Sequence, residues 1–61
     1  MFEVTLQEQL ECIEREISMR SRTYPRWVAE RKLTQTLADK EMARMNAVRS
    51  TLLGLIEERR Q

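Results

Sequence analysis

The sequence predicts an all-α protein, an antiparallel helical hairpin with a Pro-containing elbow or a short middle helix between two long helices. The 61 residues include one glycine and one proline, and 34% of them are charged, which is typical of helices. The proline, Pro25, lies between two segments whose apolar residues recur at helical spacing. The chain is short enough that we expect a single domain over residues 1–61.

The first helix is predicted at about residues 5–22. Thr5 and Glu8 have the spacing of a capping box, in which each side chain accepts a hydrogen bond from the other residue's backbone. Polar positions separate an apolar stripe that falls on one helical face, made of Leu6, Leu10, Ile13 and Ile17.

The elbow is predicted at about residues 23–33. Pro25 disfavours helical geometry at Tyr24 and removes one backbone donor, although proline is well accommodated in the first turn of a new helix. Residues 25–31 are therefore expected to form a short second helix or a bent extension of the first. We therefore expect Trp27 to be largely buried, packed near Tyr24, Leu33 and the start of the last helix.

The last helix is predicted at about residues 34–58, with Thr34 as its N-cap. From Met45 onward the apolar residues are close to a heptad repeat. The apolar stripe consists of Leu37, Ala38, Met42, Met45, Val48, Leu52, Leu55 and Ile56.

The distribution of charge agrees with an antiparallel hairpin. Residues 1–19 contain five acidic side chains and one basic side chain, whereas residues 20–32 contain five basic side chains and one acidic side chain. In a hairpin the acidic start of the first helix lies beside Arg49, Arg59 and Arg60 near the end of the last helix. Exposed ion pairs contribute only about 0–1 kcal/mol each, so they set register more than stability.

Two helices cannot enclose their own apolar stripes, and the sequence predicts a homodimer in a four-helix arrangement. A two-fold pairing would cover the remaining apolar surface with the same patch on both chains. The predicted dimer interface consists of Ile13, Ile17, Met42, Met45, Val48, Leu52 and Ile56.

Catalytic and cofactor motifs are missing from the sequence, and we expect neither an enzyme, nor a cofactor, nor a metal site. The chain has no histidine, and its single cysteine, Cys12, is expected to be a half-buried structural thiol. One cysteine cannot form an internal disulfide, which favours a reducing cytoplasm. The longest apolar run, residues 52–56, is too short to cross a membrane.

The basic elbow is the one segment with several possible functions. Arginines next to aromatic residues are typical of protein interaction sites and of nucleic-acid sites. Three interpretations stay open: a solvated elbow closed by its aromatic residues, a contact with another protein, and a contact with nucleic acid. The candidate residues are Arg20, Arg22, Tyr24, Arg26, Trp27 and Arg31.

Residues 6–53 resemble a family of small phage and prophage proteins. The shared pattern consists of Glu14-Arg15-Glu16, Met19-Arg20, the string YPRWV at 24–28, Leu33-Thr34-Gln35, Ala38-Asp39, Glu41-Met42, Met45 and Thr51-Leu52. The chain departs from the family at Glu30-Arg31, where a glycine is frequent. The pattern is also similar to the proteins encoded between the exonuclease and excisionase genes of lambdoid phages. This resemblance implies a non-enzymatic factor that influences phage development and the lysis–lysogeny balance by acting on host proteins.

Overall fold

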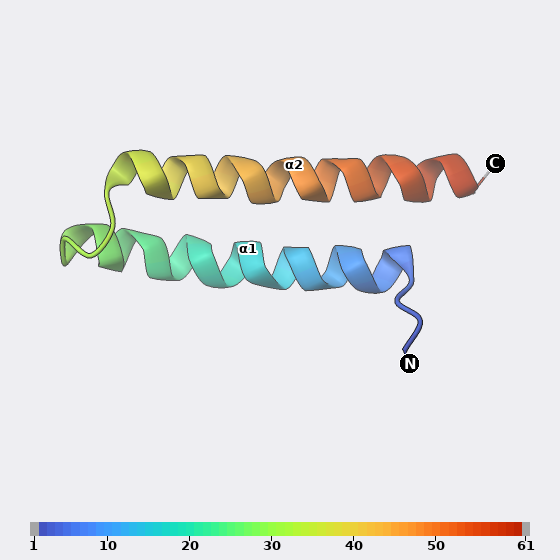
Figure 1. The fold of residues 1–61 in the computed structure, drawn as a ribbon, viewed down its shortest axis with the longest axis horizontal. Coiled ribbons are helices and arrows are strands. Elements are labelled where there is room, and N and C mark those ends of the chain that lie inside the picture. Colours follow the sequence, from blue (N-terminus) through green and yellow to red (C-terminus); the bar gives the residue numbers. More distant parts are fainter. Residues whose placement is uncertain (1, 61) are drawn as a thin grey trace.

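The computed structural model describes residues 2–60 as two long helices that run antiparallel, side by side (Figure 1). Helix α1 comprises Leu6–Ala29 and helix α2 comprises Gln35–Arg59. The molecule measures 45 × 24 × 16 Å, and no strand occurs within the described part of the chain. The predicted all-α hairpin is therefore confirmed.

Helix α1 begins at the predicted capping box. The Thr5 hydroxyl accepts a hydrogen bond from the Glu8 backbone N–H at 3.0 Å, and the Glu8 carboxylate accepts one from the Thr5 backbone N–H at 3.3 Å. Two of the N–H groups at the start of the helix thus have side-chain partners.

Helix α1 does not end before Pro25, so the predicted helix end at residue 22 and the predicted elbow at 23–33 are wrong. The helix continues through Pro25 to Ala29, and the chain outside regular helix is reduced to residues 30–34. Proline removes a single intrahelical hydrogen bond, the one to the Ser21 carbonyl, and Pro25 is exposed, so water can reach that carbonyl. The half-buried side chains of Tyr24 and Val28 keep the last turns packed on α2.

A Schellman motif ends α1. The backbone N–H of Lys32 donates to the Trp27 carbonyl at 2.9 Å, and that of Arg31 donates to the Val28 carbonyl at 3.0 Å. Arg31 has a φ of 60°, the left-handed conformation that this motif requires at the residue after the C-cap. The motif turns the chain toward α2 within a few residues.

Helix α2 begins where predicted. Thr34 is its N-cap, and its hydroxyl accepts a hydrogen bond from the Leu37 backbone N–H at 3.1 Å. The helix ends at Arg59, one residue beyond the predicted end.

The core between the helices is thin. Only three apolar side chains in the described chain are buried: Leu10 from α1, and Ala38 and Leu52 from α2. Half-buried side chains extend this contact along both helices; they include Leu6, Ile13, Ile17, Tyr24, Val28, Met42, Met45 and Ile56. We call this contact between α1 and α2 the seam.

The seam includes a charged residue that the apolar pattern did not reveal. In α2 the side chains turned toward α1 are spaced 4, 3, 4, 3 and 4 residues apart and comprise Ala38, Met42, Met45, Arg49, Leu52 and Ile56. Arg49 Nε donates to Glu14 Oε2 of α1 at 3.1 Å, and both side chains are half-buried. One acidic residue of the first helix therefore lies beside Arg49 as predicted, whereas Arg59 and Arg60 form no ion pair within the described chain. Val48 lies outside the seam.

Candidate interaction surfaces

The aromatic corner, defined as Tyr24 and Trp27, lies in the last turns of α1. The ring centroids are 5.9 Å apart and the ring planes are tilted by 39°, so the predicted packing of Trp27 near Tyr24 is confirmed. The predicted burial of Trp27 is wrong, because its side chain is 37% exposed. Because α1 continues as a regular helix, Val28 faces α2, and Trp27, one residue earlier, is turned by about 100° toward solvent.

A shallow hollow lies beside Tyr24 of the aromatic corner, between α1 and the start of α2, and Trp27 is not among the residues that line it. It has a volume of about 270 Å³ and is open to solvent. Its floor includes Tyr24, Pro25, Ala38 and Met42, and polar side chains form its rim, namely Arg20, Ser21, Gln35 and Asp39. An apolar floor with a polar rim suits an apolar side chain of a partner better than a charged ligand.

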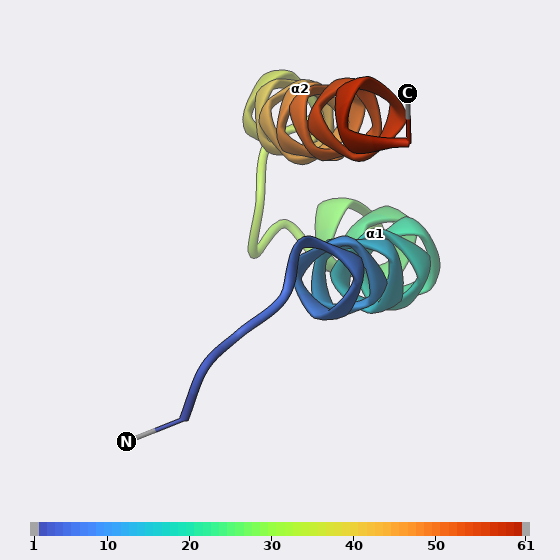
Figure 2. The same ribbon diagram turned by 90° about the vertical axis from the view of Figure 1, so that its right-hand side faces the viewer.

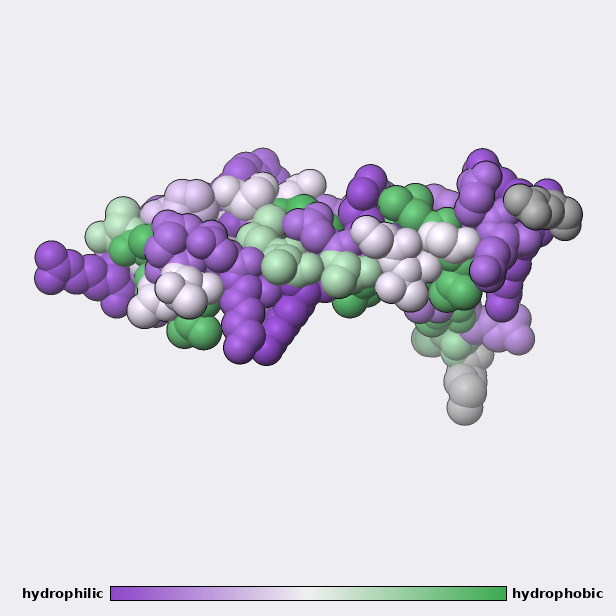
Figure 3. All heavy atoms as spheres, turned by 90° about the horizontal axis from the view of Figure 1, so that it is seen from above, coloured by the Kyte–Doolittle hydropathy of each residue, from purple (hydrophilic) through white to green (hydrophobic). Residues whose placement is uncertain are grey.

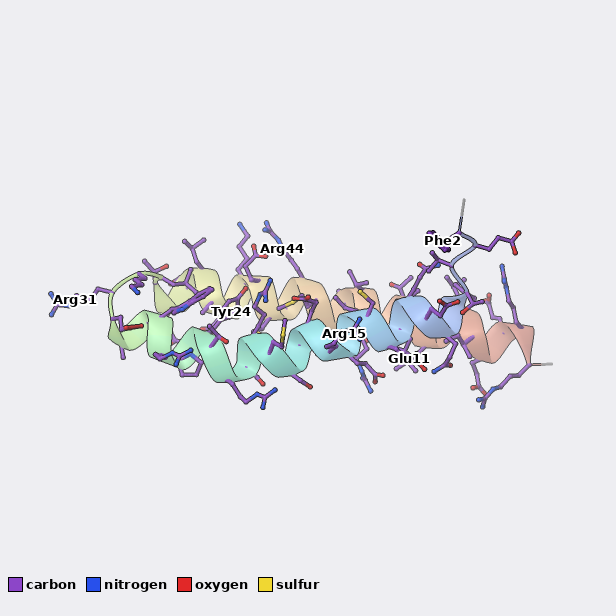
Figure 4. All side chains as sticks on the ribbon, turned by 90° about the horizontal axis from the view of Figure 1, so that it is seen from below. Phe2, Glu11, Arg15, Tyr24, Arg31 and Arg44 are labelled. Atoms are coloured by element: carbon purple, nitrogen blue, oxygen red, sulfur yellow. The ribbon has the colours of Figure 1, made fainter. Side chains whose placement is uncertain are left out.

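The basic residues of the predicted elbow divide into two groups. Arg20 pairs with Glu16 of its own helix at 3.0 Å, and Lys32 pairs with Glu30 at 3.9 Å. Within residues 2–60, no acidic side chain lies at ion-pair distance from the other three arginines, which are Arg22, Arg26 and Arg31. Arg31 lies at the turn end of the hairpin, whereas Arg15 is far along α1 (Figure 4).

Most residues of the predicted dimer interface belong to the seam. Leu52 is buried within the single chain, and five others are half-buried: Ile13, Ile17, Met42, Met45 and Ile56. Val48 differs, since 48% of its side chain is exposed. A role for these residues in a dimer stays a prediction, and the hairpin itself already accounts for much of their burial.

Helix α2 presents apolar side chains on both sides of the seam. Val48 and Leu55 are seven residues apart and therefore share one face, and Leu37 lies on the same side near the start of the helix. Leu53 is exposed on the opposite side, together with Arg49 of the Glu14–Arg49 pair. Seen from above, apolar side chains alternate with charged ones over the hairpin (Figure 3).

We call the first of these surfaces the α2 flank, defined as Leu37, Glu41, Arg44, Val48, Thr51 and Leu55. Its three apolar members are between 39% and 48% exposed, and an ion pair of 2.8 Å joins Glu41 to Arg44 between them. All three apolar members belong to the predicted apolar stripe of the last helix, but only Val48 belongs to the predicted dimer interface. The α2 flank has the same spacing of 4, 3, 4, 3 and 4 residues as the seam, so the sequence pattern alone does not distinguish the two faces.

Cys12 is exposed, so the expected half-buried position of this thiol is wrong. It lies two residues after Leu10, and a step of two residues turns the side chain to the far side of the helix. Within residues 2–60, no three cysteine, histidine or carboxylate side chains lie close enough together to hold a metal ion.

Known family models, curated proteins and solved structures contain no match to this chain. Neither α1 nor α2 is long and apolar enough to cross a membrane. The candidate surfaces are therefore the aromatic corner with its hollow, the basic residues near the turn, and the α2 flank.

Proposed function

We propose that the protein is a non-enzymatic helical interaction module that works as a homodimer, with the phage regulatory role that its sequence pattern implies. The observation that carries the proposal is the large surface left by a thin core. Protein surfaces of this kind are typical of chains that complete their core with a partner.

The accessible surface of the single chain supports self-association. It amounts to 5179 Å², whereas a compact monomer of the same mass has about 4,200 Å². The difference of about 1,000 Å² is similar to the roughly 800 Å² that each partner buries in a standard interface. The elongated shape agrees, since the radius of gyration is 14.2 Å against about 10.5 Å for a compact chain of this length.

Sedimentation equilibrium at micromolar concentration tests the homodimer. We expect a species of twice the chain mass of 7.3 kDa, with a strongly helical circular dichroism spectrum in the same sample. A stable 7.3 kDa species with full helical signal would show that one hairpin is sufficient and would overturn the proposal.

The regulatory part of the proposal rests on the string YPRWV and the residues around it, which resemble small phage proteins. The aromatic corner and the hollow beside it offer an anchoring site for a bacterial host protein, because a partly exposed tryptophan next to arginines is typical of interaction hot spots. An affinity pull-down from bacterial lysate with the native chain and a Trp27→Ala variant tests this part. We expect one stoichiometric host protein with the native chain and its loss with the variant, with Leu53→Ala as the control for an equally exposed residue elsewhere.

A nucleic-acid accessory protein is the second candidate, favoured by the three arginines near the turn that form no ion pair within the described chain. Binding through arginine–phosphate contacts falls steeply as salt increases. Fluorescence anisotropy with single- and double-stranded DNA separates the two candidates. Micromolar binding at physiological salt that is lost in an Arg22→Ala, Arg26→Ala, Arg31→Ala variant, but kept in an Arg59→Ala, Arg60→Ala control, would favour nucleic acid.

A further inference from the structure

We propose that the second copy packs on the α2 flank, with the two α2 helices antiparallel and Leu37 of each copy against Leu55 of the other. This inference rests on the proposed homodimer and specifies the surface and register through which it forms. It moves the centre of the interface from the seam, where the sequence analysis placed it, to the neighbouring face of α2.

The geometry of the hairpin identifies the side on which the partner fits. The Glu14–Arg49 pair covers one side of the seam. Val48, one residue before Arg49, is turned by about 100° to the other side, and Leu55 follows it by two helical turns. Arg44 and Phe2 point toward that same side, and Glu11 points the opposite way (Figure 4).

The charges on the α2 flank select an antiparallel pairing. In a parallel, in-register pairing Glu41 would face Glu41 of the second copy and Arg44 would face Arg44. Like charges opposed in this way destabilise a helix pair. An antiparallel pairing avoids both clashes and gives the two-fold symmetry that is usual for homodimers.

One antiparallel register places every residue of the α2 flank opposite another residue of the α2 flank on the second copy. When the two-fold axis passes at the height of residue 46, Leu37 meets Leu55 of the second copy. In the same register Arg44 meets Val48, so that the methylene groups of the arginine cover an apolar side chain. Glu41 then meets Thr51, which can donate a hydrogen bond to the carboxylate.

The neighbouring registers fit less well. With the axis at Val48, Leu37 would face Arg59 and Glu41 would face Leu55. If Val48 met Leu55 instead, Arg44 would face Arg59 and Leu37 would extend past the end of the partner helix. The first of these registers places charged side chains opposite both Leu37 and Leu55, and the second leaves Leu37 without a partner and opposes two arginines.

Helix α1 carries a second feature that agrees with the proposed axis. Glu14 of α1 lies beside Arg49 of α2, and the helices run antiparallel. Residue 46, three positions before Arg49, therefore lies beside residue 17, three positions after Glu14. Glu16 and Arg20 lie on either side of that height, are half-buried and form an ion pair of 3.0 Å. With the two-fold axis at residue 17, Glu16 of one copy lies opposite Ser18 of the other and two residues from Arg20, so the carboxylate lies within reach of a long basic side chain. The two hairpins then form a square four-helix bundle. Figure 2 shows, end-on, the two helices that each copy contributes to it.

Disulfide trapping in a Cys12→Ser background tests the register. One sample mixes Leu37→Cys chains with Leu55→Cys chains, and a matched control mixes Leu37→Cys with Leu53→Cys. Leu53 and Leu55 are 38% and 39% exposed and two residues apart, so the two thiols differ mainly in the side of α2 on which they lie. We expect the 37–55 mixture to cross-link at least about tenfold faster than the control, because disulfides form only between Cα atoms less than about 7 Å apart.

The outcomes separate this inference from the homodimer. Equal rates in the two mixtures, from chains that sediment as dimers, would overturn the register and leave the homodimer standing. A 7.3 kDa species in sedimentation would overturn both. Isotope-filtered nuclear Overhauser spectroscopy on a mixture of labelled and unlabelled native chains tests the same register without any cysteine. We expect contacts between the methyl groups of Leu37 in one copy and Leu55 in the other. Their absence in a dimeric sample would contradict the register.

Discussion

Arg31 illustrates how a single residue can hold a strained conformation because a hydrogen-bonded turn requires it. It is the only residue of the described chain with a positive φ, and glycine normally occupies such a position. A side chain here costs about 1–2 kcal/mol for the left-handed conformation.

The Arg31→Gly variant should therefore be more stable than the native chain. We expect the free energy of unfolding to rise by about 1 kcal/mol, because the relief of backbone strain exceeds the added entropy of the unfolded chain. Urea denaturation followed by circular dichroism measures the change. Lys32→Gly is the control, since Lys32 has no positive φ, and it should leave stability unchanged or lower it.

Trp27 marks the limit of residue-by-residue prediction. Its neighbour Tyr24 could be predicted because the two residues are close in sequence and share a turn. Its burial could not, because that depended on where α1 ends, and the end of α1 depends on a balance between one lost hydrogen bond at Pro25 and the packing of Val28. The rule that proline disfavours a helix accounts for the lost hydrogen bond but not for the packing of Val28.

At the scale of the elements, the starts of both helices were predicted from sequence and the end of the first was not. The caps at Thr5 and Thr34 depend on residues three positions away, so the sequence contains their whole mechanism. The position of Arg49 in the seam depends on Glu14, which lies 35 positions away. The α2 flank could not be separated from the seam for the same reason, since only the contact with α1 shows which side of α2 remains exposed.

Gly54 weakens α2 without filling a structural need within the hairpin. A methyl group added at this position would meet no atom within 4 Å, and glycine in a helix interior costs about 1 kcal/mol relative to alanine. Gly54→Ala should therefore raise the melting temperature, measured by circular dichroism at fixed concentration. A lower melting temperature would show that a second chain approaches the helix at Gly54.

A substitution at the N-cap of α2 should destabilise the protein. Thr34→Ala removes the hydroxyl that accepts from the Leu37 N–H and should lower the free energy of unfolding by about 1 kcal/mol. Thr36→Ala serves as the control, because Thr36 is exposed within the helix and has no capping role. Equal effects of the two substitutions in urea denaturation would argue against the cap.

At the scale of the whole molecule, the proposed dimer links folding to concentration. Three buried apolar residues provide a small core, so separate hairpins should be marginally stable. When only the dimer is folded, mass action raises the melting temperature as the protein concentration increases. We expect a clear rise between about 2 and 200 μM chain in calorimetry or circular dichroism. A melting temperature independent of concentration would indicate a stable single hairpin.

The first turn of α1 and the last turn of α2 lie at the same end of the hairpin (Figure 1). In the proposed antiparallel dimer, the first turn of α1 and the last turn of α2 in one copy are consequently a full molecular length from those of the other copy. A tandem fusion, in which one gene encodes two hairpins in succession, must therefore bridge the 45 Å length of the molecule. A connector of five residues cannot reach, whereas one longer than about 14 residues can, because an extended chain spans at most about 3.3–3.6 Å per residue. Short-connector fusions should then assemble between molecules into open chains, and long-connector fusions should close on themselves as single-chain bundles, a difference that size-exclusion chromatography with light scattering resolves.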